Sequence, residues 1–188
     1  MKIAMARRRK NQQRGMTLIE LMIAITILTV GLCALIGLIM TAAAGNNRNR
    51  VDTTGTFVTQ IITESIVNQP GGGQVNVKDC AGNVIAIATI GPAAAGTSLG
   101  ANLKADNTGI DFTQAVAGIP VGYKGTFVSC GTGGRTTTYD VRWNIRTIST
   151  NSRMVTVSAR HTANAASGVQ QSGVFYETPV NLRTILTK

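Results

Sequence analysis

A run of 29 predominantly apolar residues, from Met16 to Ala44, constrains this chain more than any other feature. A helix of that length reaches about 43 Å, more than the roughly 30 Å hydrocarbon core of a bilayer. Six basic residues precede the run, five of them clustered at positions 7, 8, 9, 10 and 14. The positive-inside rule keeps them in the cytoplasm. The sequence therefore predicts a single-pass membrane protein whose residues after Ala44 cross the membrane.

Glu20 is the one charged residue in the run. A carboxylate in a membrane helix is costly unless it reaches the interface, finds a partner or is neutralised, and such residues are functional candidates. An alternative is a secretory signal cut after Ala44, which would discard Glu20. The apolar region is about twice the usual length for such a signal and carries a charge, so this alternative is the weaker one.

The segment RGMTLIELMIAITILTVG resembles the leader and N-terminal helix of type IV prepilins and type II secretion pseudopilins. The resemblance implies that a prepilin peptidase cuts between Gly15 and Met16, and that Met16 is then N-methylated. In that family the fifth residue of the processed chain is Glu, which is Glu20 here. The resemblance implies that Glu20 meets the N-terminal amine of a neighbouring subunit during assembly.

The chemistry of this pair fits that role. Cleavage after Gly15 creates a positive amine close to the Glu20 carboxylate. A buried amine and a buried carboxylate are each costly alone and tolerable together, and such a pair sets register even where its net stabilisation is small. The partial positive charge of a helix N-terminus also favours a nearby carboxylate. The alternative is that Glu20 is an interfacial residue solvated by lipid headgroups.

Gly31 and Gly37 stand inside the apolar run, three residues from Ala34 and four from Cys33 respectively. Small residues at this spacing let helices approach closely in membranes. Each glycine also weakens the helix by up to about 1 kcal/mol relative to Ala. We expect these positions to serve packing or flexibility, and ordinary tolerance of glycine toward lipid is the alternative.

Residues 45–69 predict an amphipathic continuation of the helix. Apolar residues recur there at helical spacing, and the residues between them are mainly polar. Pro70 and the three glycines after it end the pattern near Gln69. The expected organisation is a leader at 1–15, a membrane half of the helix at 16–44, an amphipathic half at 45–69 and a periplasmic β-domain at 70–188.

The β-domain is best marked by TTTYDVRWNIRTI, in which apolar and polar residues alternate from Tyr139 to Arg146. RMVTVSARH supplies an antiparallel partner. We expect weaker strands at 74–77, 84–90, 122–129 and 174–176, and a long loop at 91–109. The expected fold class is α+β, a type IV pilin-like long helix packed on an antiparallel sheet.

The YDVRWNI and MVTVSAR strands, together with ILTVGLCALIGL in the helix, are similar to PilV-like minor pilins and minor pseudopilins. That resemblance implies a minor type IV pilin that primes or caps a pilus. Its partners would be the prepilin peptidase, other minor and major pilins and an inner-membrane assembly platform. The alternatives are a type II secretion minor pseudopilin and a membrane-anchored periplasmic binding or adhesion module.

The net charge of +10 suggests nucleic-acid binding, but the leader supplies six of the eighteen basic residues. The processed chain has twelve basic residues against eight acidic ones, a net charge of +4. Arg142 and Arg146 are expected on the outward face of one strand, with Arg153 and Arg160 on or near its partner. Such a stripe could contact phosphate, but exposed arginines on strands more often serve solubility and edge protection. Nucleic-acid binding is therefore not predicted.

Cys80 and Cys130 are the two cysteines of the exported part, where disulfides are permitted. A bond between them would close a loop of about 50 residues, and many pilins carry one disulfide; two free thiols are the alternative. Cys33 lies in the apolar run as a packing residue. The single histidine, His161, has no nearby Cys or carboxylate in sequence, so we expect no enzyme activity, no metal and no cofactor.

Overall fold

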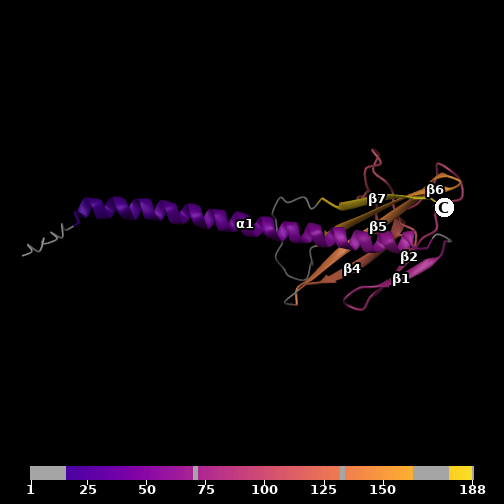
Figure 1. Cartoon of the computed structure of the whole chain (residues 1–188), viewed down its shortest axis with the longest axis horizontal. Helices are drawn as coiled ribbons and strands as arrows, with labels where there is room; N and C mark the ends of the chain where they lie inside the picture. Colours follow the sequence, from indigo (N-terminus) through magenta and orange to yellow (C-terminus); the bar gives the residue numbers. More distant parts are fainter. Residues whose placement is uncertain (1–15, 70–71, 132–133, 163–177, 188) are drawn as a thin grey trace, which may run out of the picture. The chain divides into compact units, whose positions relative to one another are not determined.

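The computed structural model describes residues 16–69, 72–131, 134–162 and 178–187 (Figure 1). Two compact units divide between Asn46 and Asn47. One long helix, α1 (Leu18–Val67), begins in the first unit and contributes its later part to the second. All the strands belong to the second unit.

The part of α1 in the first unit is exposed along its whole length. Its large apolar side chains are exposed: Leu18 is 77% exposed and Leu32 is 49% exposed. One helix of this kind is long and apolar enough to cross a membrane. A segment that no part of the described chain covers must bury its apolar surface elsewhere, and a bilayer provides that environment.

The second part of α1 packs against a sheet. Its buried positions follow helical spacing and are Gly55, Val58, Thr59, Ile62, Thr63 and Ile66. The helix ends at Val67, two residues before the predicted end at Gln69. The chain turns more tightly just after the helix, because the Gln69 N–H donates to the carbonyl three residues earlier, that of Ile66, at 3.3 Å.

The main sheet is antiparallel and has five strands: β3 (Ser98–Gly100), β4 (Lys124–Cys130), β5 (Thr136–Ser149), β6 (Ser152–Thr162) and β7 (Val180–Thr187). β5 lies at its centre. One edge of β5 pairs with β6, and the other is shared by β4 and β3. β7 pairs with the far edge of β6. The predicted α+β architecture, with a long helix on an antiparallel sheet, is confirmed.

The apolar face of β5 packs under α1, as its alternation predicts. Tyr139, Val141, Trp143 and Ile145 are buried, and the Tyr139 hydroxyl donates to the Val51 carbonyl of α1 at 2.9 Å. Across the β5–β6 register they stand beside Val155, Val157 and Ala159, which are also buried. These side chains and those of α1 form one core.

The opposite face of β5 was expected to be exposed, and this expectation is wrong. Arg142 is 2% exposed and Asn144 is 3% exposed. Residues 101–114 lie over this face: the Arg142 guanidinium donates to the Gln114 carbonyl at 2.8 Å, and the Asn144 amide to the Ala101 carbonyl at 2.7 Å. A period-2 pattern shows which residues share a face, but not whether a distant segment covers it.

A second, two-stranded sheet is formed by β1 (Gln74–Lys78) and β2 (Val84–Ala88). Its turn is tied to β4 through Asp79, whose carboxylate accepts hydrogen bonds from the Asn83 side chain and the backbone N–H groups of Asn83 and Val128. Burial acts to raise the pKa of Asp79, but these hydrogen bonds outweigh it and lower the pKa below its usual value. A disulfide joins the neighbouring Cys80 to Cys130, with 5.9 Å between their Cα atoms.

The sequence interpretation missed two strands. β3 lies inside 91–109, which was expected to be a long loop, and Leu103 also bridges to Ile110. β7 was not predicted, although its half-buried residues alternate with exposed ones along the strand. The strand expected at 174–176 lies outside the described residues.

We expect removal of the Cys80–Cys130 disulfide to destabilise the exported unit. It closes a loop of 50 residues, and restricting an unfolded chain to this extent contributes about 3 to 4 kcal/mol. Urea unfolding of the processed chain in detergent, comparing wild type with the C80S/C130S variant, measures the loss. C33S is the matched control, because Cys33 is free and exposed. An unchanged midpoint in C80S/C130S would contradict the expectation.

Candidate functional site

The candidate site is the start of α1. Met16 and Thr17 precede the helix, and Glu20 is the third residue within it. Gly15 and the rest of the proposed leader lie outside the described residues. The structure therefore places one side of the proposed cleavage position, Met16, directly before the first turn of a long helix.

Thr17 caps this helix. The backbone N–H of Glu20 donates to the Thr17 hydroxyl oxygen at 3.3 Å, and the N–H of Leu21 donates to the Thr17 carbonyl at 3.1 Å. Thr17 and Glu20 thus have the spacing of a capping box, in which the glutamate can reach back to the N–H of the cap residue. Sequence reasoning missed this role, although the Thr-x-x-Glu spacing was available. The capping-box spacing offers Glu20 a local structural role at the start of the helix.

The Glu20 side chain is exposed. In the described part of the chain, no basic group lies within ion-pairing distance of its carboxylate. Glu20 also lies in the first turn of α1, where the helix dipole favours a negative charge. The carboxylate is thus available at the helix start, among exposed apolar side chains.

Gly31 and Gly37 lie further along the exposed part of α1. A Cβ atom added at either position would meet nothing within 4 Å. Within the described part of the chain, neither glycine therefore serves packing. Both leave open space on the helix surface, where another helix can approach.

The predicted arginine stripe does not form. Arg142 is buried and ion-pairs with Asp140 at 2.8 Å, and its guanidinium lies 4.8 Å from the Phe112 ring centre. Arg160 shares Asp140 at 3.4 Å and lies over the same ring. Arg153 lies in the β6 alternation with Val155, on the opposite side of the sheet from Arg142. Arg146 shares the face of Arg142 and is half-buried. The four arginines therefore form no continuous exposed stripe, in line with the expectation that this surface does not serve to bind nucleic acid.

No metal site is found among the described residues, where no three Cys, His, Asp or Glu side chains come together. His161 lies in β6, and its ring meets the Tyr139 ring edge-on at a centroid distance of 5.8 Å. That contact places the histidine in the packing of the sheet.

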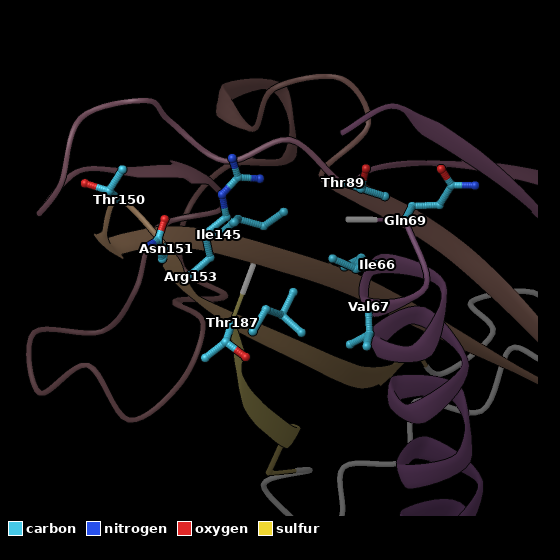
Figure 2. Close-up of a pocket in the computed structure, with 10 residues that line it drawn as sticks. Ile66, Val67, Gln69, Thr89, Ile145, Thr150, Asn151, Arg153 and Thr187 are labelled. Atoms are coloured by element: carbon cyan, nitrogen blue, oxygen red, sulfur yellow. The ribbon is translucent and has the colours of Figure 1, made fainter. Parts of the chain in front are cut away.

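A small pocket of about 110 Å³ opens between the end of α1 and the tip of the β5–β6 hairpin (Figure 2). Its apolar lining includes Ile66, Ile145 and Leu186, and Arg153 and Asn151 are among its polar residues. A cavity of this size holds a few water molecules or one side chain. It brings together none of the predicted site residues.

Comparison with known proteins gives one match. Residues 10–32 match the family model of the prokaryotic N-terminal methylation motif, a type IV prepilin-like signal. The matched range contains Gly15, Met16, Glu20 and Gly31. No curated protein and no solved structure is significantly similar to the chain. The motif supports the prepilin resemblance, and it concerns the start of the chain rather than the β-domain.

Proposed function

We propose that this chain, which carries a type IV prepilin-like signal, is a minor type IV pilin of PilV-like character. The observation that carries the proposal is the position of Glu20: five residues after Gly15, within the matched motif, and in the first turn of a helix with an exposed apolar surface. The proposed function is structural: the chain helps to prime or cap a pilus and catalyses no reaction.

Processing creates the second half of the proposed assembly site. A prepilin peptidase cuts between Gly15 and Met16, and Met16 becomes the methylated N-terminus. The new amine is positive, and the Glu20 carboxylate of a neighbouring subunit is its partner. In an apolar environment each charge is costly without the other, so the pair favours one register between adjacent helices.

The proposed location follows from the same segment. The chain waits in the bacterial inner membrane with its β-domain in the periplasm, and then joins other minor and major pilins through α1 at the assembly platform. Gly31 and Gly37 let neighbouring helices approach during this step.

We expect mass spectrometry of the protein purified from its host to find an N-methylated Met16 and no residues 1–15. A bulky residue before the cut should block a peptidase that accepts glycine there, so Gly15→Val is expected to leave the leader attached. Gly45→Val is the matched control, because a Cβ there meets nothing within 4 Å. An N-terminus after Ala44 in the wild-type protein would contradict the proposal.

A type II secretion minor pseudopilin is the second candidate, because the segment RGMTLIELMIAITILTVG resembles the leaders of prepilins and pseudopilins alike. Deleting the gene separates the two: loss of surface pili with normal secretion favours the pilin, and the reverse favours the pseudopilin. An adhesion module anchored by α1 is the third candidate. It predicts pili in normal numbers and reduced attachment after deletion.

A further inference from the structure

A polar pocket of about 230 Å³ lies beside α1 shortly after the apolar run. Asn47, Arg50, Val51 and Thr54 line one side, at the spacing of a single helix face, and Arg135, Thr136 and Thr137 line the other. The volume is several times the roughly 30 Å³ that a water molecule occupies in the liquid. The pocket lies wholly within the second unit.

Two guanidinium groups and the hydroxyl groups of Thr136 and Thr137 give this pocket the chemistry of an anion site. The Thr54 hydroxyl donates to the Arg50 carbonyl at 2.9 Å and so contributes no donor. In the described part of the chain, no carboxylate ion-pairs with Arg50 or Arg135, whereas the Arg48 guanidinium ion-pairs with the Asp52 carboxylate at 3.9 Å. Guanidinium groups bind phosphate through paired, charge-assisted hydrogen bonds. The pocket therefore offers positive charge and hydroxyl groups to a phosphate.

Local structure holds the two arginines near each other. The Gly131 N–H donates to the Arg135 carbonyl at 2.7 Å. This hydrogen bond links the residue after β4 to the residue before β5. The Arg50 guanidinium lies directly against Gly131, where a Cβ atom would collide with it. Arg50 comes from the helix and Arg135 from the chain before β5, so one anion can meet both.

The sequence places this pocket next to the apolar run. The run ends at Ala44, and Asn47 and Arg50 follow three and six residues later. Arginine side chains near the ends of membrane helices reach the headgroup interface. Because the basic residues before the run stay in the cytoplasm, the interface beside Arg50 is the periplasmic one.

We propose that Arg50 and Arg135 bind the phosphate of an anionic phospholipid on the periplasmic side of the membrane. The proposal rests on the proposed function only in taking α1 as a membrane helix. Its consequence is that a membrane lipid holds the β-domain at the bilayer surface before assembly. The lipid must then leave when the subunit enters a filament.

Native mass spectrometry of the processed full-length chain tests this proposal, using nanodiscs with equal amounts of phosphatidylglycerol and phosphatidylcholine. We expect wild type to retain phosphatidylglycerol preferentially, and R50Q/R135Q to lower that preference by about 30-fold, a factor of about five for each arginine. K78Q/K104Q removes the same charge from two exposed positions and is expected to keep the preference.

Three results would overturn the lipid site. The first is an unchanged preference in R50Q/R135Q, and the second is equal retention of both lipids by wild type, as expected if the arginines face an acidic protein. The third is displacement of the lipid by inorganic phosphate at matched ionic strength, which would indicate a general phosphate site.

Resistance of the chain to alkaline extraction from the membrane is measured in parallel. A chain that leaves the membrane contradicts the proposed function as well, whereas an inserted chain without lipid preference contradicts only this inference.

Discussion

Glu20→Ala is expected to leave processing and membrane insertion unchanged and to lower incorporation into filaments by at least about 100-fold. The reason is that removing one partner of a buried ion pair costs about 3 to 5 kcal/mol, because the other charge stays buried without compensation. In this case the uncompensated charge is the amine of Met16. The measurement is the amount of this subunit in sheared filaments relative to the amount in the membrane.

Glu20→Gln separates pairing between subunits from helix capping. Glutamine supports a capping box, so it preserves the local role with Thr17 but lacks the charge. We expect E20Q to fail in assembly as E20A does. Glu64→Ala is the matched control, because Glu64 is exposed on the same helix. Normal assembly of E20Q would show that capping, rather than charge pairing, is the function of Glu20.

Trp143→Ala is expected to destabilise the exported unit by about 3 to 5 kcal/mol, the usual cost of truncating a fully buried tryptophan. Trp143 is 0% exposed, and its indole N–H donates to the Ala88 carbonyl of β2 at 3.1 Å. The Tyr123 ring lies beside it, at a centroid distance of 6.4 Å. This one side chain therefore joins the main sheet to the two-stranded sheet.

Trp143 is the single tryptophan of the chain, so unfolding of the variant in urea must be followed by circular dichroism rather than tryptophan fluorescence. Trp143→Phe keeps an aromatic ring and leaves the Ala88 carbonyl unpaired, at a cost of about 1 to 3 kcal/mol on top of the lost volume. Val121→Ala is the control, since Val121 is 89% exposed and such substitutions usually stay within about 0.5 kcal/mol. A loss below 1 kcal/mol in W143A would contradict the role assigned to Trp143.

The signals of the candidate site are local, so the sequence alone suffices to propose it. Gly15, Met16 and Glu20 follow each other within six residues, and the matched motif covers the same segment. The Thr17 cap is equally local, because the Thr-x-x-Glu spacing of a capping box lies within one helical turn. The Arg50 pocket was not predictable, because Arg50 and Arg135 are 85 positions apart and only folding brings them to one pocket.

The strands illustrate the same difference. β5 and β6 were predicted because both alternate strongly and are separated by a short turn. β3 has only three residues, and its strand conformation depends on pairing with β5. β7 alternates more weakly, and it depends on pairing with β6. Short or weakly patterned segments adopt strand geometry when a neighbour supplies the hydrogen bonds.

By itself the sequence determined the membrane-length helix, its end near Pro70, the prepilin-like signal and the apolar face of the central hairpin. Each depends on hydropathy, breaker residues or spacing within a few turns of chain. Only the tertiary structure decided what covers the second face of that hairpin. Arg142 is buried there because Phe112, Gln114 and Asp140 supply a ring, a carbonyl and a carboxylate to its guanidinium. A buried charge is tolerated only where partners surround it, and two of these three are supplied by a distant segment of the chain.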